Sequence, residues 1–283
     1  MTTRTLANVI PSIPASDGAG VKLRRSLGSR RGLYHDPFLM LDEFYSDDPN
    51  DYLAGFPAHP HRGFETVTYM LDGHMRHEDN FGHRGDLGPG DVQWMTAAHG
   101  IIHSEMPQQT AGRMRGFQLW LNLPAAEKMQ PADYRDIPSR EIPSVALPGG
   151  VQVRVIAGVL GAVSGPVNGA DARKTTDPLY LDLHLPAAAS ADIPLAAGRN
   201  AFLYAYEGEV RVGGQLVPHR AAATLGDGDA VTLTAGAQGA RVLLLAARPL
   251  REPVVQYGPF VMNTHEQIEQ AIADYQSGRL AAV

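Results

Sequence analysis

The chain has no cysteine and no long hydrophobic run, and each absence excludes a class of protein. Without cysteine there is neither a disulfide nor a thiolate site, so any bound metal has to be held by histidine and carboxylate groups. No stretch approaches the roughly 18 apolar residues of a membrane span, and residues 1–16 lack the apolar core of a signal peptide. We therefore expect a cytoplasmic protein that does not act within a membrane.

Positive charge is also scarce, with 24 Lys and Arg against 30 Asp and Glu, a net charge of −6. Nonspecific binding to phosphate backbones needs clustered cations, so no direct contact with nucleic acid is expected. The basic stretch 22–31 is the local exception. It is interpreted as a solvated hairpin, with a surface for a protein partner as the alternative.

Alternating apolar residues separated by turns predict an all-β protein. The 30 glycines and 21 prolines fit many turns and short strands, and 283 residues suffice for two medium domains. A proline- and glycine-rich segment at 124–150 reads as a linker. The turn at 87–91 recurs at 225–229, followed at the same distance by Thr-Ala in both copies. We predict a domain at 1–137 and a second, related domain at 138–283.

Two short motifs place ligand-type side chains in pairs. His59 and His61 form one pair, and His103 and Glu105 form the other. Residues two apart on a strand project from the same face, so the four groups converge if the two strands lie side by side. Three imidazoles and one carboxylate suit a divalent first-row metal, with positions left for water, oxygen or substrate. The competing interpretation is a polar cluster without metal.

The second copy lacks these groups. The spacing that aligns the two turns carries His103 onto Arg241 and Glu105 onto Leu243. The region around Ala197, where the other two histidines would fall, has no histidine close by. We therefore expect the second domain to be metal-free and structural.

The end of the chain predicts one amphipathic helix at 264–279. Ile268, Ala271, Ile272 and Tyr275 are spaced by three and four, as on one face of a helix. Thr264 is the expected N-cap, with Gln267 as its capping-box partner. A helix in this position is expected to cover a sheet edge.

Other polar residues near the motifs are interpreted as supporting groups. Glu65 shares the face of the first histidine pair and is expected to form a salt bridge or hydrogen bond beside the metal rather than to bind it. The segment with His74, His77 and His83 is interpreted as a solvated loop. Bulky residues around the ligand strands predict an apolar pocket for a flat organic substrate. The expected pocket residues are Phe56, Phe64, Met70, Trp94, His99 and Met106.

Together these stretches resemble the pirin family, within the cupin superfamily. The resemblance rests on residues 36–39, 59–67, 90–97, 100–107 and 258–264, among which His-Pro-His-Arg-Gly-Phe-Glu is the most specific. It implies a bicupin, with two facing antiparallel β-barrels and one metal in the first. The ligands it implies are His59, His61, His103 and Glu105.

The resemblance also implies two functions. Bacterial pirins resemble quercetin 2,3-dioxygenases, which points to cleavage of a phenolic or flavonol substrate with O₂, with Glu105 as the catalytic base for the 3-hydroxyl proton. Eukaryotic pirins resemble iron-dependent co-regulators, which leaves a metal-binding redox-sensing or regulatory protein acting through protein partners as the alternative. Fe(II) is the expected ion, and Ni, Cu, Mn and Zn also accept this ligand set.

Overall fold

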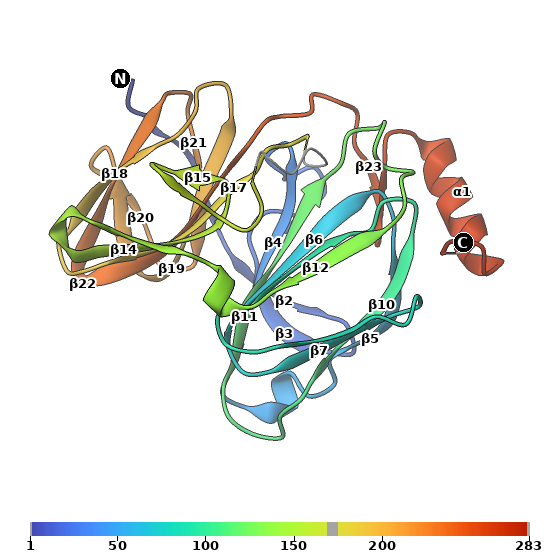
Figure 1. Ribbon diagram of the computed structural model, residues 1–283. Helices are drawn as coiled ribbons and strands as arrows, with labels where there is room; N and C mark the ends of the chain where they lie inside the picture. Colours follow the sequence, from blue (N-terminus) through green and yellow to red (C-terminus); the bar gives the residue numbers. More distant parts are fainter. Residues whose placement is uncertain (1, 169–174, 282–283) are drawn as a thin grey trace. The chain divides into compact units, whose positions relative to one another are not determined.

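The computed structural model describes residues 2–168 and 175–281, which fold mainly as β-strands (Figure 1). Their contacts form two compact units. We call Ile13–Gly28, Phe38–Ser139 and Leu250–Val283 the N-terminal barrel, and Met1–Ser12, Ser29–Pro37 and Arg140–Pro249 the C-terminal barrel. These units differ from the single boundary expected at 137/138. Residues 2–12 and 29–37 belong to the C-terminal barrel, and residues 250–281 belong to the N-terminal barrel.

Two antiparallel sheets form the N-terminal barrel. The larger has the order β12-β9-β6-β11-β4-β3-β2, and the smaller has the order β5-β10-β7-β8. Apolar side chains from both sheets, such as Phe44 and Met75, pack in one cluster. The strands are β2 (Ile13–Asp17), β3 (Val21–Arg25), β4 (Phe38–Ser46), β5 (Phe56–His61), β6 (Phe64–Asp72), β7 (Met75–Asp79), β8 (Arg84–Leu87), β9 (Val92–Thr96), β10 (Ile101–Pro107), β11 (Met114–Asn122) and β12 (Asp133–Ile137).

The C-terminal barrel is built on one sheet of order β1-β21-β19-β22-β17-β14-β13, with β18 on β22 and β20 on β19. Its core is a large cluster of aliphatic side chains, among them Leu181, Leu183 and Leu244. The strands, including the separate pair β15 and β16, are β1 (Leu6–Pro11), β13 (Ser144–Leu147), β14 (Val151–Ala157), β15 (Val159–Leu160), β16 (Val163–Ser164), β17 (Leu179–Leu185), β18 (Ser190–Pro194), β19 (Asn200–Val212), β20 (Gln215–Val217), β21 (Ala221–Leu225) and β22 (Ala230–Ala247).

The repeated turn has the same role in both barrels. Residues 88–91 join β8 to β9, and residues 226–229 join β21 to β22. The positions that align with the metal motif, Arg241 and Leu243, both lie on β22. Arg241 pairs with Glu207 at 3.3 Å, and Leu243 is fully buried.

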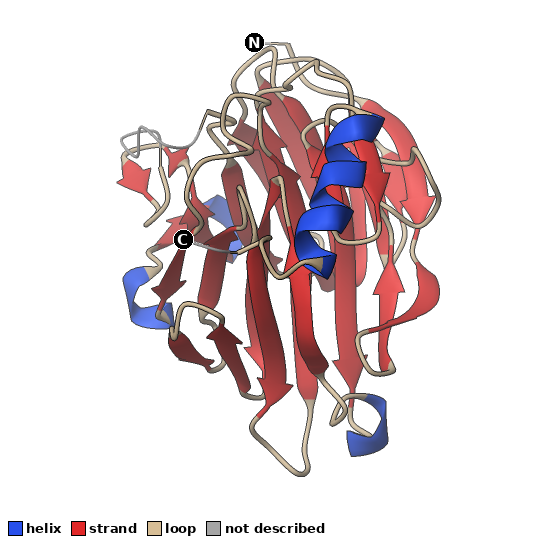
Figure 2. Ribbon diagram, turned by 90° about the vertical axis from the view of Figure 1, so that its right-hand side faces the viewer, coloured by secondary structure: helices blue, strands red, loops and turns tan. Residues whose placement is uncertain are grey.

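The chain ends in a hairpin, β23 (Val255–Tyr257) and β24 (Phe260–Met262), and in helix α1 (His265–Gln276). As predicted, Thr264 caps the helix and Gln267 completes the capping box. Ile268 and Ala271 pack with Phe260 of the hairpin. Figure 2 shows α1 lying along the strands of the N-terminal barrel. The short 3-10 helices are η1 (Pro49–Asp51), η2 (Ser139–Glu141) and η3 (Pro148–Gly150).

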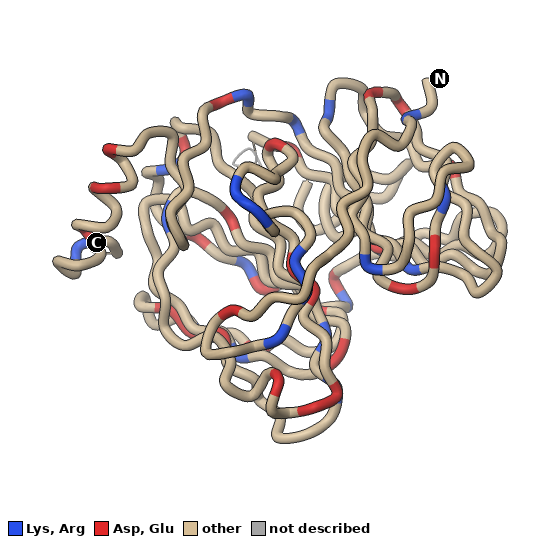
Figure 3. Tube along the Cα trace, turned by 180° about the vertical axis from the view of Figure 1, so that it is seen from behind, with Lys and Arg blue, Asp and Glu red and all other residues tan. Residues whose placement is uncertain are grey.

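Charge is spread over both units, with acidic positions between the basic ones (Figure 3). In the basic stretch 22–31, Lys22 pairs with Asp51 at 2.5 Å, and Arg25 pairs with Asp17 and Asp42, each at 2.7 Å. None of the helices in the described ranges is long and apolar enough to cross a bilayer.

Candidate metal centre

Three histidines meet where β5 and β10 pair. The two strands are antiparallel neighbours, and His103 lies directly opposite His59 in their register. The Nε2 atoms of His59 and His61 are 3.0 Å apart. The His103 ring centroid is 4.3 Å from that of His59 and 4.8 Å from that of His61. Two nitrogens bound at about 2.1 Å to one ion, at roughly a right angle, would be about 3.0 Å apart, so the spacing suits a single metal.

Burial holds two of these imidazoles neutral, the form that binds metals. His61 and His103 are 3% and 1% exposed, and this burial, with the neighbouring imidazoles, lowers the pKa of each well below the usual value. The Nδ1 atom of His59 lies 2.8 Å from the carbonyl oxygen of Pro57. A proton on this Nδ1 leaves the Nε2 lone pair directed at the cluster.

Buried ring atoms at this cluster lack a hydrogen-bond partner. Within the described residues, Nε2 of His103 has none, and its other ring nitrogen is the one beside His77. Nδ1 of His61 also has none, but that ring meets His59 through Nε2. Unpaired buried nitrogens are costly and rare in folded proteins. A metal ion would provide the missing interaction for a ring nitrogen that faces the cluster. The residues present therefore fit the metal that the sequence predicts.

Glu105 lies beside this cluster but outside it. One ligand atom from each of the three histidines falls within 4.8 Å of the others, and no Glu105 oxygen belongs to that group. The carboxylate is 5% exposed, with Oε1 3.0 Å from Thr68 Oγ1 and Oε2 accepting from Gln118 Nε2 at 3.3 Å. Burial raises its pKa, against the effects of His59 and the two hydrogen bonds. Its assignment as a fourth ligand stays a prediction.

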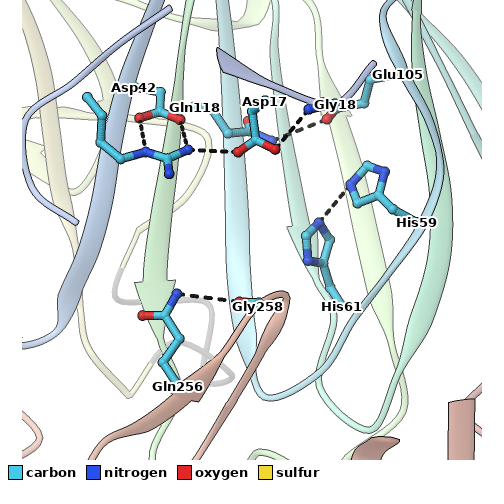
Figure 4. Close-up of polar contacts among 10 residues, drawn as sticks. Asp17, Gly18, Asp42, His59, His61, Glu105, Gln118, Gln256 and Gly258 are labelled. Atoms are coloured by element: carbon cyan, nitrogen blue, oxygen red, sulfur yellow. Dashed lines mark hydrogen bonds and ion pairs between the residues drawn. The ribbon is translucent and has the colours of Figure 1, made fainter. Parts of the chain in front are cut away.

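The centre opens onto a cavity of about 620 Å³ inside the N-terminal barrel. His59, His61 and Glu105 lie on its wall, and Figure 4 shows them on one side of the space. Apolar side chains make up much of the rest, and a volume of this size is typical of a small-molecule site. The other lining residues are Asp17, Gly18, Ala19, Leu23, Arg25, Gly28, Met40, Asp42, Phe44, Phe56, Pro57, Thr68, Met75, Gln118, Trp120, Gln256, Gly258 and Pro259.

Comparison with known proteins assigns the fold to a family. The pirin family model matches residues 20–121, and the model of the pirin C-terminal cupin domain matches residues 180–281. The chain belongs to the pirin family. It is therefore a bicupin, with one cupin domain in each matched region.

Individual pirin relatives align over nearly the whole chain. A Pseudomonas aeruginosa protein, named provisionally as a quercetin 2,3-dioxygenase, is 56% identical over 95% of each chain. Human pirin is 43% identical over 93% of this chain and 89% of its own. The crystal structure of quercetin 2,3-dioxygenase from Acinetobacter baumannii superposes with a TM-score of 0.90, at 31% identity and 98% coverage of both chains.

The predicted pocket residues lie mostly elsewhere in the pirin fold. Of the six, Phe56 lines the cavity. Met70 is in the barrel core, and Phe64 packs on Trp120 with ring centroids 4.4 Å apart. His99 binds the Gln130 carbonyl through Nδ1 at 3.0 Å. Trp94 is buried outside the lining, and Met106 is half-buried and also outside it. Strand parity alone does not separate the cavity from the packed core beside it.

Glu65 is buried on β6, and its expected place beside the metal stays a prediction. It is 1% exposed, and its Oε1 accepts from Thr96 Oγ1 at 2.6 Å. The group of three histidines does not include it. Of the two interactions expected for Glu65, a salt bridge or a hydrogen bond, the contact with Thr96 is a hydrogen bond.

One histidine beside the centre was missed. His77 lies on β7, opposite Glu105 on β10, and is fully buried. Its Nδ1 is 3.3 Å from Nδ1 of His103, and burial lowers its pKa to about 4. The prediction of a solvated loop is therefore wrong here, although it holds for the exposed His74 and His83. In the sequence, Met75 and His77 alternate with the charged residues Arg76 and Glu78, and this period of two is the signal that could have revealed the strand.

Proposed function

We propose that this chain is a metal-dependent dioxygenase that cleaves a flavonol such as quercetin with O₂. The observation that carries the proposal is the cluster of three histidines, of which His59 and His61 lie on the wall of a cavity large enough for a small organic molecule. The names of the Pseudomonas and Acinetobacter relatives add the substrate class. We further propose a cytoplasmic location, as expected for a chain without cysteine.

In this proposal His59, His61 and His103 hold one divalent ion, with Glu105 as the fourth ligand and Fe(II) as the expected metal. When bound, the ion supplies Lewis-acid and redox chemistry at the substrate oxygens. The three rings keep their geometry because β5 and β10 are fixed by their pairing and two of the rings are buried.

Glu105 is the proposed acceptor of the 3-hydroxyl proton. Its carboxylate sits on the cavity wall next to the histidines, so a bound hydroxyl can come within hydrogen-bond reach. The contacts from Thr68 and Gln118 fix its orientation. Phe56 and Trp120 offer flat apolar surfaces for the substrate rings and keep water away from them.

The proposal is tested with protein purified without chelator or metal-affinity resin. Elemental analysis is expected to find one metal per chain, and the flavonol absorbance is expected to fall only when oxygen is present. The substitution His59→Ala is expected to empty the site, and His61→Ala to abolish flavonol consumption. Arg241→Ala, at the aligned position of the other barrel, is the control that leaves metal content unchanged.

Two results would contradict the proposal. A full metal content in His59→Ala would remove the ligand assignment. A metal-loaded wild-type protein that leaves the flavonol intact in air would instead favour the alternative of a metal-binding regulatory protein, of the kind considered for the pirin family.

A further inference from the structure

A second polar group lines the same cavity, on β2, β3 and β4. Arg25 donates through Nε and Nη2 to the two oxygens of Asp42, at 2.8 and 2.7 Å. Its Nη2 also donates to Oδ2 of Asp17 at 2.7 Å. All three side chains are on the cavity wall, and Figure 4 shows Asp42 across the space from His59, with Asp17 between Asp42 and Glu105. We call them the Asp17–Arg25–Asp42 triad.

The members of the triad are bound to different extents. Asp42 is 2% exposed, and its two oxygens are occupied by the bidentate pair with Arg25. The Asp17 side chain is 50% exposed and receives one further bond, from the backbone N–H of Gly18 at 2.8 Å. Each carboxylate oxygen can accept two hydrogen bonds, so Asp17 retains acceptor capacity. Arg25 Nη1 makes no hydrogen bond within the described residues, which leaves its N–H groups as donors.

Charge and hydrogen-bonding capacity together restrict what this wall can bind. One guanidinium between two carboxylates carries a net charge of −1, which disfavours carboxylate or phosphate groups. A spare acceptor on Asp17 beside spare donors on Arg25 suits a group that donates and accepts at once. A hydroxyl has this property, and two adjacent hydroxyls on an aromatic ring can use both partners.

We propose that the Asp17–Arg25–Asp42 triad is a subsite that recognises hydroxyls on the substrate ring remote from the metal. The inference rests on the proposed flavonol function and deepens it, because it assigns the preferred substrate class. Flavonols with two adjacent hydroxyls on the pendant ring are bound in preference to those with none. The hydroxyl donates to Asp17 and accepts from Arg25, while Asp42 holds the guanidinium in place.

The test measures binding of three flavonols whose pendant ring carries no hydroxyl, one hydroxyl or two adjacent hydroxyls. Quenching of tryptophan fluorescence reports binding, because Trp120 lines the cavity. In the metal-loaded wild-type protein, the affinity is expected to rise about tenfold from the first compound to the third. In Asp17→Ala the rise is lost, while the hydroxyl-free compound binds within about twofold of wild type.

Asp17 is the position to change because it is half-exposed, whereas loss of Arg25 would leave the buried Asp42 carboxylate unpaired. The matched control is Asp47→Ala, which removes another exposed carboxylate that pairs with an arginine, Arg113, outside the cavity lining. It is expected to keep the full tenfold rise.

The outcomes separate the subsite from the reaction. Equal affinity for all three compounds in a wild-type protein that still consumes flavonol with oxygen overturns the subsite alone. A tenfold rise that persists in Asp17→Ala overturns it as well. Absence of quenching by every flavonol overturns both the subsite and the proposed function.

Discussion

At the residue scale, the contact between His77 and His103 is expected to fix the orientation of a metal ligand. Both rings are buried, and the two Nδ1 atoms are 3.3 Å apart. One of these nitrogens carries the shared proton, so the hydrogen bond determines which His103 nitrogen faces the metal. The change His77→Phe keeps a ring stacked near Tyr134 but removes the hydrogen bond. We expect metal affinity to fall about 10–100-fold, measured by competition with a coloured chelator.

The control for this prediction is His83→Phe. His83 belongs to the same hairpin, is exposed, and binds Asp79 through Nδ1 at 2.9 Å rather than a metal ligand. Its replacement is expected to leave metal affinity unchanged. If both variants bind metal as the wild type does, His77 has no part in orienting His103.

Individual site residues were predictable to the extent that the signal was local. The His-x-His and His-x-Glu spacings are short-range patterns, and the structure does bring the three histidines together. The cavity wall was harder, because Arg25 and Trp120 reach it through strand pairing between distant segments. Asp42, a carboxylate within a continuous run of buried residues, was a visible signal that a polar group lies inside the barrel.

At the scale of elements, the terminal hairpin β23–β24 supports the strand end that carries His61. Arg62 pairs with Phe260 in a parallel bridge and forms an ion pair with Asp274 of α1 at 2.8 Å. Gly63 has a φ of +92°, and a Cβ there would lie 2.0 Å from the carbonyl oxygen of Val261. The close packing of the hairpin against the motif therefore requires glycine at this position.

We expect Gly63→Ala to destabilise the N-terminal barrel and to reduce its metal content. Gly82→Ala is the matched control, since Gly82 has a φ of +85° but no atom within 4 Å of an added Cβ. Both variants have the backbone strain of about 1–2 kcal/mol, and only Gly63→Ala has a further steric cost of about 1–3 kcal/mol. Thermal unfolding and elemental analysis measure the two effects. Equal melting temperatures for the two variants would contradict the close packing.

The elements themselves were predicted unevenly. The capping box of α1 is encoded within four residues, so the sequence shows where the helix begins. The spacing of Ile268 and Ala271 shows which face is buried. The bridge between Arg62 and Phe260 joins residues nearly 200 positions apart, and no local pattern encodes it. For the same reason the sequence predicted the helix but assigned it to the second domain rather than to the N-terminal barrel.

At the scale of the whole molecule, one buried cation makes the stability of the N-terminal barrel depend on pH. Lys128 is 1% exposed, and its Nζ donates to the carbonyl oxygens of Gly63 and Val261 and to Asn122 Oδ1, at 2.6, 3.0 and 2.6 Å. It thus links the metal-binding motif to the terminal hairpin. Burial lowers its pKa from 10.5 to about 7.

The direction of the pH dependence follows from this lowered pKa. Between about pH 7 and 10.5 the unfolded chain binds a proton at Lys128 that the folded barrel does not, so the free energy of unfolding rises with pH. Below pH 7 both states are protonated, and the cost of burying the ammonium is fully present. From pH 7 to 9 we expect Lys128 to contribute a rise of about 2 kcal/mol.

The measurement is urea unfolding of metal-free protein at pH 7 and pH 9, followed by tryptophan fluorescence. Both tryptophans, Trp94 and Trp120, belong to the N-terminal barrel, so the signal reports that unit. Lys128→Met removes the titrating group. The unfolding free energy of this variant should therefore rise less between pH 7 and pH 9 than that of the wild type, and the difference is the contribution of Lys128. Lys22→Met removes an exposed lysine and should keep the wild-type rise. Equal rises in wild type and Lys128→Met would show that Lys128 stays protonated in the folded barrel, with its three acceptors outweighing the effect of burial.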